Sequence, residues 1–450
     1  MSILVVTLIT ALRAACIALI AVGVGVCGVR YLRALRTSTA SVLVWLLLLV
    51  LLMPAMTMSS FGALSKTATI GRFSELHYSM FVLMRMAPLA MLFVWLFPPS
   101  LSTESLRSFE LMSPLPWLHR LRWRIAGYMQ EFRSLFCVMF LLVFQEFDLA
   151  ACWNARSWTI TLFDAQAGGL ALGESLKMMI WPLAIEGVIL ALLLTRGSVT
   201  SRQVSRDLST SDRGAMGEPM AVTLIVLTFG FFSFLGPMRL LSAGVKGLPI
   251  ALENFALTRE VTNSMILALV SSISAWLLAC WAEGNRVRVM TLALPGLLGS
   301  LVLSLILLAV FQVPPLHLLR GSPLPVLLAL ILMLMPCALF VRHILSRATQ
   351  SEAAHLALLS GARSVRWQLT KRPALWGGAL LFLQAYGDFT ANSLLAPPAL
   401  TSAFSRIFNL MHYGQTSVLS AMLLITLTVP LMALLLTTFI SRIYATRRDQ

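Results

Sequence analysis

The feature that most constrains this chain is a series of apolar runs that are too long for an ordinary soluble core. Uninterrupted stretches such as Val42–Pro54 and Ala293–Val310 recur along the sequence. About 20 apolar residues cross a bilayer as a helix, and a helix satisfies its own backbone polar groups in lipid. A membrane β-barrel would show alternating segments of about 10 residues. The runs do not alternate, so the sequence predicts an all-α polytopic membrane protein.

The composition agrees with this prediction. Of the 450 residues, 58% are hydrophobic and 12% are charged, whereas soluble proteins carry about 25% charged residues. We expect eleven spans with these bounds: 4–29, 41–60, 77–98, 134–151, 173–195, 219–237, 261–282, 289–312, 324–343, 374–395 and 416–440.

The basic residues sort to one side of the predicted spans. Loops on that side carry 23 of the 34 Lys and Arg residues, and the positive-inside rule makes that face cytoplasmic. The N-terminus would then be periplasmic and the C-terminus cytoplasmic, in a bacterial inner membrane. The net charge of +16 is a topology signal in this interpretation, and we expect no nucleic-acid partner. Arg13 either snorkels outward from the first run, or residues 1–12 lie on the surface.

The two halves of the sequence resemble each other in a shared order. Chance similarity between apolar helices rarely aligns the polar, Gly and Pro residues that interrupt them. The shared order of the matches therefore indicates an internal repeat. The matches are Pro88–Val94 with Pro336–Val341, Glu104–Arg124 with Glu352–Arg372, Phe144–Asp148 with Leu383–Asp388, and Gly173–Leu176 with Gly414–Ser417.

Each copy of the repeat contains five predicted spans. The first copy covers 1–200 with a cytoplasmic loop at 100–133, and the second covers 259–450 with a loop at 344–373. The linker 201–258 carries one extra span, which restores the orientation after an odd number of crossings. The copies would therefore be parallel, related by an axis along the membrane normal. This arrangement places both loops on the cytoplasmic side, where two identical partners could dock.

The second loop carries a recognisable sequence. Glu352-Ala-Ala-His-Leu-Ala-Leu-Leu-Ser-Gly361, followed by basic residues and Pro373, resembles the cytoplasmic EAA loop of binding-protein-dependent ABC importer permeases. Gln384–Phe389 is similar to the span that follows this loop in permeases of the ferric-iron and thiamine type. These are often fused two-copy chains. The resemblance covers about 4–195 and 261–440, and it implies the type I ABC importer permease fold.

The resemblance also implies a function and partners. It implies a permease that translocates a small solute, with the ferric iron or thiamine class favoured, delivered by a periplasmic binding protein. Two copies of a cytoplasmic ABC ATPase subunit would bind the ATP and Mg²⁺. The loop would form two short helices joined at Gly361, which can adopt the required turn, with Leu356, Leu359 and Val365 as the apolar docking residues. The implied coupling residues are Glu352, Ala353, Ala354, Gly361, Arg363, Arg366 and Pro373, with Glu104 and Ser113 in the first copy.

The chain departs from the family pattern in both loops. The spacing from Glu352 to Gly361 is longer than in the family, and Ser113 stands where the first copy should have Gly. Unequal docking of the two loops would follow from these differences.

Ionisable residues inside predicted spans are functional candidates by default. From helix rise, Arg85 and Glu146 both lie about 12 Å from the outer edge of the bilayer core. Their counterparts in the second copy are Met333 and Ala385, so both charges occur in one copy only. We expect an Arg85–Glu146 ion pair, in which either charge left alone would be costly.

Other polar residues fall in similar places in the two copies. Gln145 and Asp148 match Gln384 and Asp388, and Gly387-Asp388-Phe389 is typical of a helix interruption. These side chains either line a pathway near the midline or satisfy backbone groups that a helix break sets free. Glu186 lies about 20 Å from the outer edge by helix rise. It would line the inner half of the pathway or pair with a basic loop residue.

Several functional classes find no support in the sequence. No P-loop pattern occurs, so we expect this chain not to hydrolyse ATP and not to be an enzyme. The six histidines and six cysteines show no metal-ligand spacing, and we expect no metal or cofactor on this chain. The N-terminus lacks a basic signal region, and we expect it to be retained. Two alternatives stay open: an ion-coupled secondary transporter or channel that uses the intramembrane acids as a relay, and an integral-membrane enzyme.

Overall fold

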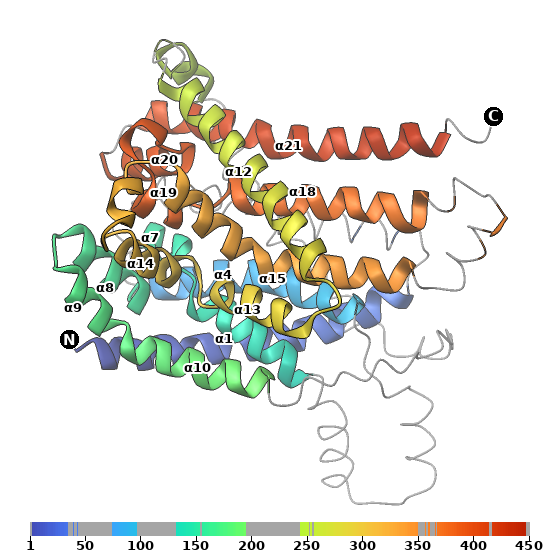
Figure 1. Cartoon of the computed structure of the whole chain (residues 1–450), viewed down its shortest axis with the longest axis horizontal. Coiled ribbons are helices and arrows are strands. Elements are labelled where there is room, and N and C mark those ends of the chain that lie inside the picture. The colour runs from blue at the N-terminus through green and yellow to red at the C-terminus, as the bar shows by residue number, and fades with distance from the viewer. Residues whose placement is uncertain are drawn as a thin grey trace, which may run out of the picture. The chain divides into compact units, whose positions relative to one another are not determined.

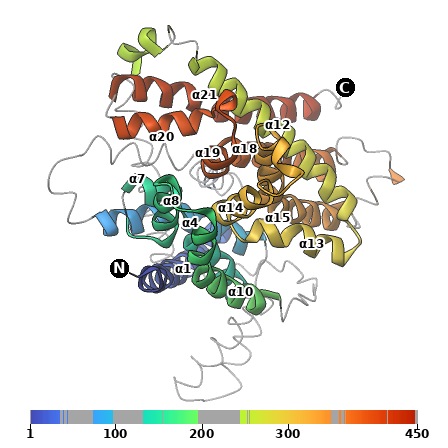
Figure 2. The same cartoon turned by 60° about the vertical axis from the view of Figure 1, so that its left-hand side comes forward.

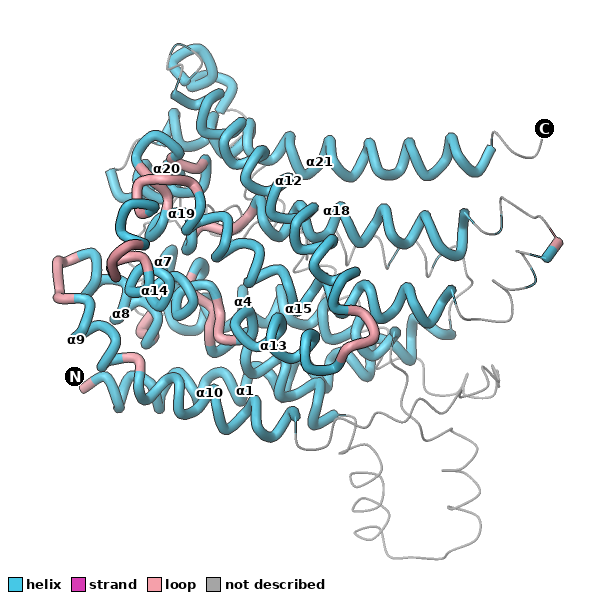
Figure 3. Tube along the Cα trace, viewed as in Figure 1, coloured by secondary structure: helices cyan, strands magenta, loops and turns pink. Residues whose placement is uncertain are grey.

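The computed structural model describes residues 2–34, 74–96, 132–153, 155–194, 244–251, 256–349, 367–413 and 416–446, with residues 39, 43, 253, 356, 359, 360 and 365 as isolated positions. Throughout these ranges the regular structure is helical and no strand occurs (Figure 3). The all-α prediction is therefore confirmed for the described part of the chain. The predicted spans 41–60 (residue 43 apart) and 219–237 lie outside it.

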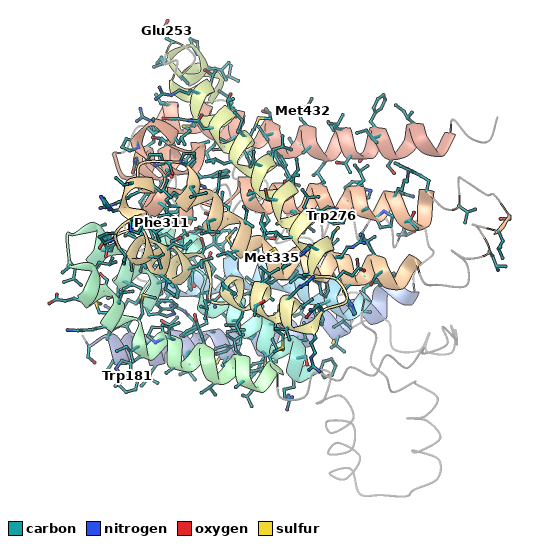
Figure 4. The ribbon with its side chains drawn as sticks, in the orientation of Figure 1. Trp181, Glu253, Trp276, Phe311, Met335 and Met432 are labelled. Atoms are coloured by element: carbon teal, nitrogen blue, oxygen red, sulfur yellow. The ribbon has the colours of Figure 1, made fainter. Side chains whose placement is uncertain are left out.

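Five of the described helices are long and apolar enough to cross a membrane, and two bent helix pairs raise the number to seven. This is the composition of a membrane-embedded protein. The exposed apolar side chains agree, because a lipid-facing surface needs no polar cover. Trp181 and Met432 project outward from their helices (Figure 4) and are 49% and 63% exposed. The five single spans are Ile3–Val29, Ser74–Trp95, Leu257–Ala282, Leu324–Ser346 and Val418–Ser441.

The chain forms two compact units. The first contains Met1–Leu51, Ala68–Thr161 and Met178–Ser233, and the second contains Leu52–Thr67, Leu162–Lys177 and Phe234–Gln450. The short segment Leu162–Lys177 thus belongs to the second unit although it lies early in the sequence. Its Phe163 ring contacts the rings of Phe389 and Phe408, each with centroids 6.3 Å apart.

The first unit is built on two long helices, α1 (Ile3–Ala34) and α4 (Ser74–Leu96), which pack along each other. Glycines allow this close approach, as is common between membrane helices. A Cβ atom added at Gly25 would lie 2.9 Å from the backbone carbonyl carbon of Ala90. The other helices of this unit are Phe132–Phe144, α7 (Asp148–Trp153), the start of α8 (Trp158–Ala167) and α10 (Ile180–Leu194).

The second unit is built on α12 (Ala256–Ala282), α15 (Leu324–Thr349), α18 (Arg372–Tyr386) and α21 (Thr416–Thr446). Figure 1 shows α12 crossing α15 and α18, and α12 contacts both. The remaining helices are α9 (Leu172–Met178), α13 (Arg286–Leu297), α14 (Ser300–Val310), the 3₁₀ turns Leu316–Leu319 and Pro398–Leu400, the π-helical turn Trp367–Lys371, α19 (Thr390–Leu395) and α20 (Ala403–Tyr413).

The predicted span 289–312 is divided into two helices by a sharp bend. Two helices, α13 and α14, occupy this region and meet at an angle of 101°. Gly299 lies at the bend with φ +83°, a conformation that residues with a Cβ rarely adopt. The side chains of α13 are all at least partly exposed, whereas those of α14 are mostly buried. Both helices contact α15, and α14 is the more deeply buried of the two.

Three other predicted spans are interrupted. The span 134–151 breaks after Phe144 and resumes as α7, and 173–195 consists of α9 and α10 with a bend of 45°. The span 374–395 ends as α18 at Tyr386 and resumes as α19. The predicted interruption at Gly387–Phe389 is confirmed by this break.

Candidate functional site

A buried carboxylate holds the helix break in the first unit. Glu146 lies in the interruption between the helix that ends at Phe144 and α7. Its two carboxylate oxygens accept hydrogen bonds from the backbone N–H groups of Leu149 (2.9 Å) and Ala150 (3.2 Å). The first N–H groups of a helix have no partner within the helix, so the buried Glu146 carboxylate supplies a cap for α7.

A second buried carboxylate holds the break in the second unit. Asp388 Oδ2 accepts a hydrogen bond from the backbone N–H of Ala391 in α19 at 2.9 Å. Its Oδ1 accepts the hydroxyl proton of Ser300, the first residue of α14, at 2.8 Å. The carboxylate therefore ties the beginnings of two interrupted helices together. This geometry agrees with the interpretation that Asp388 satisfies backbone groups freed at a break.

Glu146 makes the kind of hydrogen bond that Asp388 makes. The sequence match pairs Asp148 with Asp388, but Asp148 is the first residue of α7. Glu146 and Asp388 each bond the N–H group three residues further along the chain. The match aligned Gln145 with Gln384 and thereby shifted the acids out of register.

Similar hydrogen bonds follow the break in each unit. The backbone N–H of Trp158, at the start of α8, donates to the Thr10 hydroxyl of α1 at 3.3 Å. The backbone N–H of Ala403, at the start of α20, donates to the Ser264 hydroxyl of α12 at 2.9 Å. Both hydroxyls also donate to a carbonyl one turn earlier in their own helix. Each unit thus uses a hydroxyl of its first long helix to hold the start of a later helix.

The Arg85–Glu146 ion pair predicted from helix depth does not form. Both residues are described, and they are close enough for their charges to interact. No contact within 4.0 Å joins them, because backbone N–H groups of α7 occupy the Glu146 oxygens. The depth argument placed the residues at the right level and missed the competing backbone donors.

Sequence reasoning missed an ion pair in the first unit. Arg13 of α1 pairs with Glu75 in the first turn of α4, and its guanidinium lies 4.4 Å from the centre of the Tyr78 ring. The other Glu75 oxygen accepts the backbone N–H of Arg156 at 2.7 Å. Arg13 is therefore a packed residue of the helix pair, with a side chain that is 13% exposed, and it does not snorkel outward. An Arg within an apolar run indicated that a partner was needed. The sequence did not identify Glu75 as that partner, because the two residues are far apart in the chain.

Glu186 is the least satisfied acid in the described part of the chain. It is fully buried in α10. The Gln145 side chain is its polar neighbour, but neither carboxylate oxygen has a partner of good hydrogen-bond geometry among the described residues. Pairing with a basic loop residue, one of the two roles suggested for Glu186, is not seen among the described residues. Gln384, in contrast, is exposed on α18.

The predicted coupling loop is described only in pieces. Leu356 and Leu359 are helical, and the backbone N–H of Ser360 donates to the Leu356 carbonyl at 2.9 Å. Ser360 is the last residue of this turn that the structure describes. Pro373 lies in the first turn of α18, where Pro is well tolerated. Outside the described residues lie Glu104, Ser113, Glu352, Ala353, Ala354, Gly361, Arg363 and Arg366.

The second unit contains a cavity that sequence reasoning did not predict. Its volume is about 480 Å³. The ends of α14 and α19 form part of its wall through Leu308, Phe311 and Leu394, and Figure 4 labels Phe311. His317 and Arg320 add polar groups at the wall. Among the described residues, no three His, Cys, Asp or Glu side chains could hold a metal ion together.

Comparison with known proteins adds no further information on this arrangement. No family model matches the sequence, and neither curated proteins nor solved structures gave a match.

Proposed function

We propose that this chain is the two-copy permease subunit of an ATP-driven importer of the ABC type. The observation that carries the proposal is the apolar surface of the loop 344–373. Leu356, Leu359 and Val365 are 63%, 70% and 41% exposed. By the charge distribution this loop is cytoplasmic, so lipid does not cover these side chains. A short apolar helical surface on a basic loop fits the groove of a partner protein.

The two copies are supported by matched local structure. Besides the carboxylate caps and the hydroxyl bonds described above, Ser157 and Ser402 each accept the backbone N–H three residues further on, both at 3.2 Å. Pro88 and Pro336, which the sequence match aligns, both lie inside long helices. Three kinds of hydrogen bond in the same order are more specific than similarity between apolar sequences.

The remaining parts of the proposal follow from the loop resemblance. Two ATPase subunits would dock on the loops at 100–133 and 344–373 and hydrolyse ATP. A periplasmic binding protein would deliver the solute, for which ferric iron or thiamine is the favoured class. This chain would sit in the bacterial inner membrane with its N-terminus periplasmic and its C-terminus cytoplasmic. It would form the pathway between its two copies and would not itself be an enzyme.

The proposal can be tested at the loop. In Leu356→Glu/Leu359→Glu, the charges should prevent docking into an apolar groove. We expect loss of the co-purifying P-loop ATPase and of ATP-dependent uptake into vesicles. The matched control is Leu318→Glu, since Leu318 is 76% exposed in the loop before α15, which the topology places outside. If the loop variant keeps both the ATPase and uptake, or if the control loses them equally, the proposal is wrong.

A second candidate is an ion-coupled transporter that works without an ATPase. The buried and unsatisfied Glu186 carboxylate favours it, because intramembrane acids often serve as ion or proton sites. The purified chain alone, reconstituted into vesicles, should then take up solute in response to a proton or sodium gradient. Glu186→Gln should abolish that uptake. Uptake that requires ATP and a partner subunit would exclude this candidate.

A further inference from the structure

The interrupted helices α14 and α19 run side by side in the same direction. The first turn of each helix is hydrogen-bonded to the Asp388 carboxylate. The Ser300 hydroxyl of α14 donates to Oδ1, and the Ala391 N–H of α19 donates to Oδ2. Their far ends meet again at one cavity, where Leu308 of α14 and Leu394 of α19 form part of the same wall. The two helices contact each other and lie close together in Figure 2. A buried seam therefore connects the carboxylate with the cavity.

Two buried oxygen atoms along this seam have no hydrogen-bond partner among the described residues. They are Oγ of Ser304 on α14 and Oδ1 of Asn392 on α19. The two residues are 0% and 6% exposed. Other buried hydroxyls of the chain, such as that of Ser271, donate to a carbonyl in the preceding turn. Ser304 does not, so its hydroxyl is available to a group outside its own helix.

The orientation of the Asn392 amide is determined by its other end. Its Nδ2 donates to the Asp388 carbonyl at 2.8 Å. Rotating the amide by half a turn would place two acceptor oxygens against each other, so Oδ1 must point away from that carbonyl. The unpartnered atom is therefore an acceptor that needs a donor.

The two oxygens lie at the same level of the seam. Ser304 is one turn beyond Ser300, and Asn392 is one turn beyond Asp388. Four residues advance a helix by about 6 Å, and residues four apart share a helix face. Since Ser300 faces Asp388, Ser304 faces α19 near Asn392. The two side chains do not bond each other directly.

We propose that a bound water molecule bridges Ser304 and Asn392. The water accepts a hydrogen bond from the Ser304 hydroxyl and donates one to Oδ1 of Asn392. Buried polar groups normally find a protein or water partner, and buried waters occupy such positions between otherwise unsatisfied groups. In a membrane-embedded protein the alternative is an unsatisfied polar group in hydrocarbon surroundings, which is costly.

The number of available oxygens favours water at this position. Hard cations such as Mg²⁺ and Ca²⁺ take six or more oxygen ligands, whereas the unpartnered atoms here are two neutral side-chain oxygens. A buried water needs only two to four polar partners. The inference does not depend on the proposed transport function.

Removal of the Ser304 hydroxyl tests the water directly. Ser304→Ala should fold, because Ala has the highest helix propensity. We expect its thermal unfolding midpoint in detergent to fall by about 2 °C, since the water loses a partner. The control is Ser271→Ala, which removes an equally buried hydroxyl that bonds only within its own helix. The proposal is overturned if the unfolding midpoint of Ser304→Ala equals that of the unaltered chain, or if it is higher than that of Ser271→Ala.

Two further measurements identify the ligand. If one water links both side chains, Ser304→Ala and Asn392→Ala should not be additive, and the double variant should lose less than the sum of the single losses. Additive losses overturn the bridge. The midpoint of the unaltered chain should also be equal in sodium, potassium and choline chloride at one ionic strength. A specific rise with sodium or potassium would identify a cation and overturn the assignment of a neutral ligand.

Discussion

At the residue scale, this chain uses buried carboxylates to hold the starts of short helices that follow a helix break. Glu146 and Asp388 each accept a backbone N–H that a helix break leaves without a partner. The sequence predicted the break at Gly387–Phe389, since Gly and Asp interrupt an apolar run. It did not predict that Glu146 has the role of Asp388, because a cap depends on where the next helix begins, and similarity of neighbouring residues does not reveal that position.

Removing the carboxylate should therefore cost stability. Asp388→Ala leaves both the Ala391 N–H and the Ser300 hydroxyl without their partner. We expect the free energy of unfolding to fall by about 1–2 kcal/mol, and Asp388→Asn to lose less because an amide oxygen can still accept one bond. Thermal unfolding in detergent measures both effects. Glu253→Ala, at an exposed site, is the control. A smaller loss for Asp388→Ala than for Asp388→Asn would contradict the capping role.

The observed ion pair between Arg13 and Glu75 gives a second prediction. A double-mutant cycle on Arg13→Met and Glu75→Gln should give a coupling energy of about 1 kcal/mol, because one partner is largely buried. The same cycle on Arg85→Met and Glu146→Gln should give less than about 0.5 kcal/mol, since no direct ion pair forms there. Both cycles are measured by chemical or thermal unfolding. A larger coupling for the second pair would restore the original prediction and refute the observed contacts.

At the element scale, long apolar runs predicted that helices exist, but they did not predict where those helices bend. The run at 289–312 contains Gly296 and Gly299 among apolar residues, and nothing in its composition distinguishes a bend from a straight span. The bend depends on tertiary contacts, because Ser300 must reach Asp388, which lies between α18 and α19. The position of such a bend depends on hydrogen bonds between residues that are distant in the sequence. The local sequence around the bend therefore cannot predict it.

The packing of α13 against α15 depends on one glycine. A Cβ atom at Gly296 would lie 2.3 Å from the Leu332 carbonyl oxygen and 2.6 Å from Pro336 Cδ. Gly296→Ala must push the helices apart, and we expect a loss of about 1–3 kcal/mol. Gly378→Ala on α18 meets no atom within 4 Å and should stabilise by about 0.5–1 kcal/mol through helix propensity. Thermal unfolding of both variants checks the contrast. Equal effects would show that this contact does not limit the packing.

At the scale of the whole molecule, the compact units and the halves of the sequence do not coincide. The segment Leu162–Lys177 belongs to the second unit although the sequence repeat places it in the first copy. The local structures that do recur in the two units include the carboxylate caps of Glu146 and Asp388. The sequence repeat does not determine which copy a connecting segment packs against, since that depends on apolar contacts such as Phe163 with Phe389. The two-copy organisation is therefore best tested through topology, loop by loop.

The topology prediction can be checked at two residues on either side of α15. Leu318 precedes this helix and Leu359 follows it, and they are 76% and 70% exposed, so a reagent should reach them equally well when it is on the correct side. In a background without the six native cysteines, a membrane-impermeant maleimide should label Leu318→Cys in intact spheroplasts. It should label Leu359→Cys only after the membrane is opened, because the basic loop is expected inside. The reverse pattern would invert the orientation and with it the proposed docking side. Labelling of both residues in intact spheroplasts would show that α15 does not cross the membrane.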